Sequence, residues 1–167
     1  MPLSGSLSGI GLSYNPAMDK AVVGPAIGKL PSSLAILTCG EHAMLASWIQ
    51  QASFDPLILT VAIKSGRPML VTVATAKSFA LSLLAEDSNA LMTVFAKGED
   101  GALAKVAHAP SPSGHPILKD ALAWLECRVR QTVPTGDHVL VVAEVIGGAI
   151  QREGKPRVHL RRNGFSY

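Results

Sequence analysis

Two long segments joined by a short turn constrain the fold of this chain more than any other feature. Residues 121–133 alternate in side-chain character, with apolar residues repeatedly on one parity, and residues 138–150 form a second long strand-like segment. Pro134-Thr135-Gly136-Asp137 lies between them, and these residue types favour a tight turn. The pattern predicts an antiparallel β-hairpin.

Shorter apolar segments bounded by turn residues predict further strands at 34–38, 43–48, 57–63, 79–84 and 157–160. Helices are expected at 16–29, 69–76 and 89–97, and residues 98–116 read as a long loop. A doubly wound sheet needs regular alternation of strands and helices, which is missing here. The pattern predicts a mainly β fold, a small antiparallel barrel with flanking helices.

A length of 167 residues fits one domain, which we place at 16–167 after a Gly/Ser-rich lead-in at 1–15. Hydrophobic residues make up 48% of the chain, enough for a core. A net charge of +3 is too small to indicate nucleic-acid binding, but it suits a site for a small anion. Cys39 and Cys127 are isolated and read as reduced thiols. With no signal peptide or membrane-length apolar run, the chain is expected in the cytoplasm.

Motifs for metal-dependent or hydrolytic chemistry are missing from the sequence. There is no G-x-S-x-G elbow, no phosphate-binding Walker motif and no H-E-x-x-H pattern. The five histidines show no i, i+4 spacing, so no metal site is predicted. If the chain is an enzyme, a bound organic cofactor is therefore expected to supply the reactivity.

Segment 44–56 offers one set of cofactor-binding groups. It leaves one strand, makes an irregular excursion and enters the next strand after Pro56. Such an excursion presents backbone N–H and C=O groups that can bind a flat heteroaromatic ring, and Ser47 and Ser53 add hydroxyls. The alternative is an ordinary connection in which Trp48 belongs to the core.

Lys64, Ser65 and Arg67 form a compact cationic turn around Gly66. Backbone amides in such a turn, together with Lys and Arg, suit a phosphate group. The alternative is a solvated turn without a ligand.

His138 follows Gly136-Asp137 at the start of a long strand. It could hydrogen-bond the edge of a flavin or nicotinamide ring, or it could be a turn histidine bonded to Asp137. The basic and aromatic ending 159–167 could clamp a flat anion or pack on a partner subunit, or it could be a frayed tail.

Four segments together are similar to a known family. They are AMLASWIQQASFDPLILTVAI (43–63), HPILKDALAWLECRV (115–129), GDHVLVVAEV (136–145) and HLRRNGFSY (159–167). Their order and spacing resemble the flavin reductase-like family with an FMN-binding split barrel, and especially the C-terminal flavin reductase module of cyanobacterial flavodiiron proteins. The resemblance covers about 34–167 and implies a six-stranded antiparallel split β-barrel of Greek-key type.

The resemblance also implies a function: hydride transfer from NADH or NADPH to bound FMN, with FAD the less expected flavin. Electrons would pass to a diiron flavoprotein and oxygen, to a ferric complex or to free flavin, and the protein would be a homodimer. His138 would lie near the ring and the nicotinamide as the catalytic residue. The implied cofactor-binding residues are Ala46, Ser47, Trp48, Ile49, Ser53, Lys64, Ser65, Arg67 and Tyr167. Two alternatives stay open: a non-catalytic FMN-binding electron relay, and a split barrel that binds haem or pyridoxal phosphate.

Overall fold

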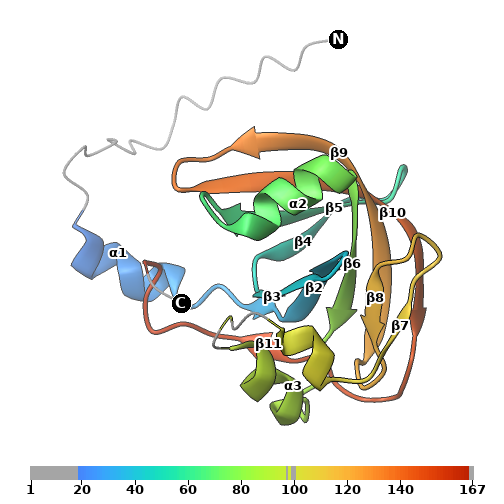
Figure 1. Ribbon diagram of the computed structural model, residues 1–167. Helices are drawn as coiled ribbons and strands as arrows, with labels where there is room; N and C mark the ends of the chain where they lie inside the picture. The colour runs from blue at the N-terminus through green and yellow to red at the C-terminus, as the bar shows by residue number, and fades with distance from the viewer. Residues whose placement is uncertain (1–18, 97, 99–100, 166–167) are drawn as a thin grey trace. The chain divides into compact units, whose positions relative to one another are not determined.

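The computed structural model describes residues 19–96, 98 and 101–165 (Figure 1). The described residues divide into two compact units, one within 1–30 and 161–167 and the other within 31–160. The predicted lead-in at 1–15 and its boundary at residue 16 lie outside the described residues. Among the described residues, no helix combines the length and the apolar character needed to cross a membrane.

One antiparallel sheet dominates the larger unit, in the order β3-β2-β6-β9-β10-β5-β4. The strands are β2 (Ala35–Cys39), β3 (His42–Ala46), β4 (Ile49–Ser53), β5 (Ile58–Lys64), β6 (Ser78–Leu83), β9 (Ala123–Pro134) and β10 (His138–Ile150). This confirms the mainly β, antiparallel prediction and the β9–β10 hairpin. The sheet has one strand more than the six expected, and the additional strand is β4.

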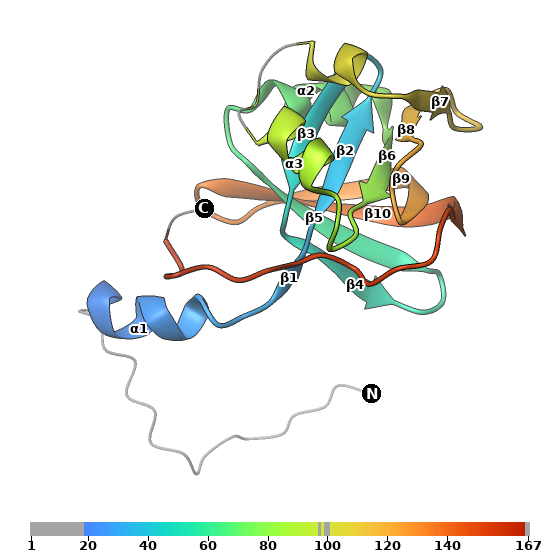
Figure 2. The same cartoon turned by 90° about the horizontal axis from the view of Figure 1, so that it is seen from below.

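Strand β4 corrects the prediction of an irregular excursion over 44–56. Its central residues Gln50, Gln51 and Ala52 are exposed, and only its end residues are half-buried. A strand that is mostly solvated has no apolar alternation to reveal it in the sequence. Its pairing with β5 makes it a strand, and Figure 2 shows that hairpin beside β10.

The short link between β3 and β4 closes the sheet into a barrel. These strands lie at opposite edges of the sheet, yet only Ser47 and Trp48 separate them in sequence. Three Cα–Cα steps span at most about 11 Å, so the two edges must converge at this point. The strands of the two edges are not paired with each other, which is the geometry of a split barrel.

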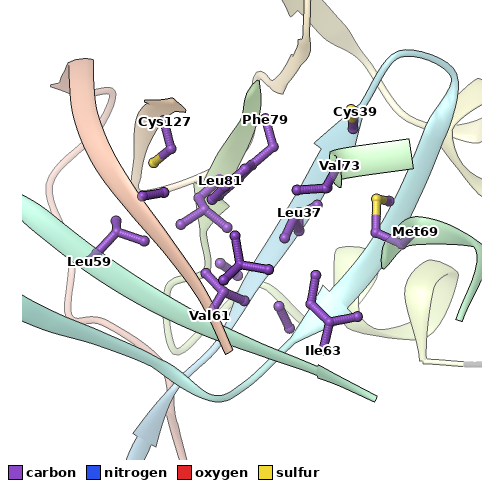
Figure 3. Packing of buried hydrophobic residues seen from close by; sticks show 14 residues of the cluster. Leu37, Cys39, Leu59, Val61, Ile63, Met69, Val73, Phe79, Leu81 and Cys127 are labelled. Carbon is purple, nitrogen blue, oxygen red and sulfur yellow. The ribbon is translucent and has the colours of Figure 1, made fainter. Parts of the chain in front are cut away.

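The barrel interior is filled by alternate residues of the strands and by helix α2 (Pro68–Ala76). Figure 3 shows Met69 and Val73 of this helix against Leu37, Ile63 and other strand residues. A second apolar cluster joins Ile36 and Leu84 to helix α3 (Asn89–Phe95) and to the 3-10 helix η1 (Ala102–Lys105). The barrel therefore has an apolar core on both faces of β2.

The predicted loop over 98–116 contains regular structure, so that prediction is wrong in part. Besides η1 it carries β7 (His108–Pro110), which pairs with β8 (Pro116–Leu118) in a small hairpin. The predicted last strand is reduced to β11 (Val158–His159), which pairs with β1 (Ser32–Ser33) outside the main sheet. Short strands with few apolar residues give a weak signal in sequence.

The smaller unit contains helix α1 (Lys20–Ile27) and the described part of the C-terminal segment. The Asp19 carboxylate accepts a hydrogen bond from the Ala21 N–H at 2.8 Å and caps the helix. The Phe165 ring packs on Gly24, where an added Cβ would lie only 3.0 Å from it. The Lys20 ammonium lies 5.2 Å from the centre of the same ring. Helix α1 and the described part of the C-terminal segment are thus packed together.

Candidate functional site

The two-residue link that closes the barrel leaves backbone groups available for a ligand. The Trp48 carbonyl accepts a hydrogen bond from the Ala62 N–H at 3.0 Å, which fixes the link against β5. Within the described part of the chain, the Ser47 backbone makes no hydrogen bond. Ala46 and Ile49 belong to paired strands, and the Ile49 carbonyl accepts a hydrogen bond from the Ser33 hydroxyl at 3.3 Å. The prediction that residues 46–49 bind a ring through backbone groups therefore depends mainly on Ser47.

The turn after β5 places its cations at the start of α2. Gly66 adopts φ +81°, a left-handed conformation that glycine tolerates, and an added Cβ would meet nothing within 4 Å. Arg67 occupies the N-cap position, and Pro68 begins the helix. The Ser65 N–H donates to the Asp137 carbonyl at 2.9 Å, so this turn is held against the β9–β10 turn.

His138 is buried although it lies on the outer face of the barrel. Val141 points into the barrel, so His138, three residues earlier, lies on the opposite face, directly across from Lys64 on β5. The Trp48 ring covers it, with ring centres 4.6 Å apart and planes inclined by 37°. The imidazole Nδ1–H donates to the Asp137 carboxylate at 2.8 Å, as the alternative of a turn histidine predicted. The predicted contact of His138 with a flavin or nicotinamide ring stays a prediction.

The charges of this cluster are coupled. The hydrogen bond from His138, together with the nearby charges of His138 and Lys64, holds the pKa of Asp137 below its ordinary value. Asp137 is exposed and anionic, and it fixes the orientation of a buried ring. The site therefore combines an oriented imidazole, an aromatic face and the Lys64 cation.

Four of the ten predicted site residues converge. Ala46 is buried in the barrel core and Ile49 packs against that core, so their side chains do not join the cluster. Strand register brings Trp48, Lys64, Ser65 and His138 to the same end of β5. Ser53 pairs with Ile58, six residues from Lys64 along β5 and about 20 Å away, so it does not join the cluster. Tyr167 lies outside the described residues.

The arrangement fits the FMN group that the sequence motifs imply. A turn with an open left-handed glycine leads into a helix start flanked by Lys64 and Arg67, which suits a phosphate dianion. The unbonded Ser47 backbone offers a donor and an acceptor to the polar edge of a flat ring. FMN carries both groups, a phosphate and a ring with polar edges.

A second polar cluster, which the sequence analysis missed, lies beneath the β7–β8 hairpin. The buried carboxylate of Glu126 accepts a short hydrogen bond from the Ser111 hydroxyl and another from the Ser113 N–H at 3.0 Å. Burial alone would raise the pKa of Glu126, but these hydrogen bonds and nearby His115 hold it below the ordinary value. The only sequence signal was an acidic residue within an otherwise apolar strand.

His115 completes this cluster from the same hairpin. Its Nδ1 accepts a hydrogen bond from the Gly40 N–H at 3.3 Å, so Nε2 carries the proton and donates to the Ser78 hydroxyl at 2.7 Å. This tautomer cannot withdraw a proton from Ser78, which argues against a nucleophilic serine. Burial lowers the pKa of His115, although the charge of Glu126 opposes that shift. The cluster joins the hairpin to the sheet.

The two cysteines add no reactive group to either cluster, although the Cys39 thiol donates to the Ser78 carbonyl at 3.3 Å. Both thiols are buried and free, and burial raises the pKa of Cys127 to about 12. A thiol with that pKa is neutral at physiological pH and unreactive. Among the residues that the structure describes, no three His, Cys, Asp or Glu side chains gather in a way that could hold a metal ion.

Comparison with known proteins agrees with this geometry. Residues 27–166 match the family described as "Flavin reductase like domain". Because the match covers most of the chain, the protein belongs to this family. Flavin binding and flavin reduction are thus its general chemistry, and it is an oxidoreductase.

Two relatives extend the comparison beyond the family. The chain is 40% identical over 151 residues to putative diflavin flavoprotein A 6 of Nostoc sp., covering 85% of this chain and 26% of that protein. It is 37% identical over 161 residues to putative diflavin flavoprotein A 3 of Synechocystis sp., covering 91% and 27%. The chain thus spans about a quarter of the length of these relatives. The predicted resemblance to flavodiiron proteins is confirmed.

Among solved structures, the flavin reductase PheA2 in its native state superposes with a TM-score of 0.75 at 28% identity. The alignment covers 86% of this chain and 94% of PheA2. This agreement confirms the split-barrel fold.

Proposed function

We propose that this protein binds FMN on the outer face of the barrel and reduces it with NADH or NADPH. When bound, the flavin supplies the redox chemistry, because its ring accepts a hydride and can pass the electrons to an acceptor. The observation that carries this proposal is the convergence of Trp48, Lys64, Ser65 and His138 at one end of β5, beside a phosphate-type turn.

Each residue has a distinct task in this proposal. Lys64, Ser65 and Arg67 hold the phosphate, and the backbone of residues 46–49 binds the ring edge. Asp137 fixes His138 through Nδ1, so the imidazole is held at the ring and the nicotinamide in one orientation. Trp48 covers His138 and excludes water from that side of the site. The protein thus supplies position and a dry surface rather than a proton-transfer pair.

The acceptor and the setting of the chain belong to the proposal as well. The length of the relatives supports a module that works with a diiron flavoprotein, either fused to this chain or separate. Ferric complexes or free flavin are the other acceptors. The reduced, buried cysteines are in keeping with a cytoplasmic protein.

The homodimer is also proposed rather than observed. An exposed apolar patch formed by Phe54, Leu57 and Ile146 supports it, because Phe54 is 89% exposed. The Val145 N–H donates to the Leu57 carbonyl at 2.9 Å, which places the β4–β5 turn beside this part of β10. Light scattering on the purified protein should give twice the chain mass, and a monomer would remove dimerisation from the proposal.

The test of the main proposal is a spectrum of the protein after FMN is added and the excess removed by desalting. Retained flavin absorbance that NADPH or NADH bleaches without oxygen is the expected result. Retained absorbance that neither nucleotide bleaches would replace the reductase by a flavin-binding electron relay. If the protein neither retains FMN nor quenches its fluorescence, the proposed site is wrong.

A further inference from the structure

An exposed carboxylate lies beside the turn that we assign to the FMN phosphate. Asp137 is the last residue of the β9–β10 turn, and its side chain is 80% exposed. Its carbonyl accepts a hydrogen bond from the Ser65 N–H at 2.9 Å. The next residue, His138, lies directly across from Lys64 in the pairing of β10 with β5. A negative charge at this place opposes the binding of an anion, because like charges repel.

Asp137 shares the Lys64 cation with the proposed phosphate. The hydrogen bond from His138 Nδ1–H is the main reason why the pKa of Asp137 lies below its ordinary value, and the charge of Lys64 acts in the same direction. The carboxylate is therefore ionised and close enough to Lys64 to interact with its charge. Part of the attraction that Lys64 offers to a phosphate is thus already compensated within the protein.

The backbone of the phosphate turn offers fewer donors than its sequence suggests. The Ser65 N–H is bonded to the Asp137 carbonyl, and the Arg67 N–H donates to the Lys64 carbonyl at 3.2 Å. Two amides of this turn are thus occupied within the protein. A phosphate here would depend largely on the side chains of Lys64 and Arg67, whose attraction acts through charge. A neighbouring carboxylate therefore has a direct influence on how tightly the phosphate is held.

We propose that Asp137 is a specificity-determining residue whose negative charge weakens phosphate binding and so limits the preference for FMN over riboflavin. Riboflavin has the same ring as FMN but no phosphate, so repulsion by Asp137 acts on FMN alone. This proposal rests on the proposed function, because it assumes that Lys64 and Arg67 hold the FMN phosphate. The role is separate from the hydrogen bond between Asp137 and His138, which concerns the ring side of the site.

The test compares the affinities of wild type and Asp137→Asn for FMN and for riboflavin by fluorescence titration. Asparagine has nearly the same size and keeps an oxygen acceptor for His138 Nδ1–H, so the variant mainly removes the charge. At low ionic strength the variant should bind FMN about three- to tenfold more tightly, with riboflavin binding unchanged, and high salt should reduce this gain. Glu153→Gln removes an exposed carboxylate beyond the far end of β10 and should change neither affinity.

Three outcomes would overturn the role of Asp137 and leave the proposed function intact. In the first, Asp137→Asn binds FMN no more tightly than wild type does. In the second, the variant binds FMN and riboflavin more tightly by the same factor, which would assign the effect to the ring side of the site. In the third, the gain for FMN is unchanged in high salt, which would indicate a direct contact rather than a repulsive charge. If neither wild type nor variant binds either flavin, the proposed flavin site itself is wrong.

Discussion

Two regions of this molecule each hold a buried histidine near a carboxylate, and we assign the two regions different roles. His115 and His138 are 7% and 6% exposed. The carboxylate near His115 is Glu126, which is 2% exposed, whereas the Asp137 side chain beside His138 is 80% exposed. The Glu126 cluster is enclosed by its hydrogen-bond partners, while the Asp137 pair opens to solvent next to Lys64. A buried polar cluster of the first kind specifies packing, and one of the second kind remains available to a ligand.

The largest effect is expected at Glu126. Glu126→Ala leaves the Ser111 hydroxyl and the Ser113 N–H without their acceptor and should lower the free energy of unfolding by about 2–4 kcal/mol. Urea denaturation measures this loss, with Glu153→Ala as a control at an exposed glutamate. FMN affinity should stay within about twofold, because the hydrogen-bond partners of Glu126 are not among the residues assigned to FMN. A stability equal to that of wild type would show that the cluster is not a structural anchor.

Arg67 tests the opposite region, where binding and not stability should change. Arg67→Ala removes a charge-assisted contact with the phosphate and should weaken FMN binding about 10–100-fold. Fluorescence titration measures this, and Arg128→Ala on β9 is the matched exposed control. The unfolding free energy should change by less than about 0.5 kcal/mol. Unchanged FMN affinity would show that the phosphate does not bind at this turn.

His115 should give the molecule a dependence on pH. The unfolded chain takes up this proton near the ordinary pKa of 6.5, whereas the folded imidazole takes it up only at lower pH. The unfolded state therefore binds more protons below pH 6.5, and wild-type stability should fall as the pH drops towards the folded pKa. The lowered pKa of Glu126 acts in the same direction at lower pH.

His115→Gln should cost about 1–2 kcal/mol at pH 7.5 through lost hydrogen bonds with Gly40 and Ser78. Its deficit against wild type should shrink on acidification, because the variant lacks the titrating group. Urea melts at pH 7.5, 6.5 and 5.5 measure the difference. A deficit that stays constant across this range would mean that His115 does not carry the dependence on pH.

The smallest effect on stability is expected at Asp137. Asp137→Ala removes the acceptor of His138 Nδ1–H, but the Asp137 side chain is 80% exposed and water can take its place, so unfolding should change by less than about 0.5 kcal/mol. The change should instead appear in the NMR signals of the His138 ring, which loses its fixed orientation. Asp137→Asn keeps an oxygen acceptor and should restore that orientation. If Asp137→Ala destabilises the protein as much as Glu126→Ala does, the two regions do not differ in the way proposed.

The sequence alone determined the features that depend on local pattern. Alternation over 121–133 and the turn at 134–137 gave the β9–β10 hairpin, because a period of two and a turn are readable from neighbouring residues. The motifs over 43–63 and 136–145 indicated the family, since they preserve both residue type and order. Lys64, Ser65 and Arg67 were recognisable as a cationic turn for the same reason.

Only the tertiary structure decided which residues meet. Strand β4 was invisible in sequence because it is an exposed edge strand stabilised by its pairing with β5. That pairing carries Ser53 away from Lys64, although both belonged to the same predicted site. Glu126 and His115 are eleven residues apart in sequence and join through Ser111 because the β7–β8 hairpin folds over β9. Such contacts arise from register and closure of the sheet, which follow from pairing between distant segments rather than from any local run of residues.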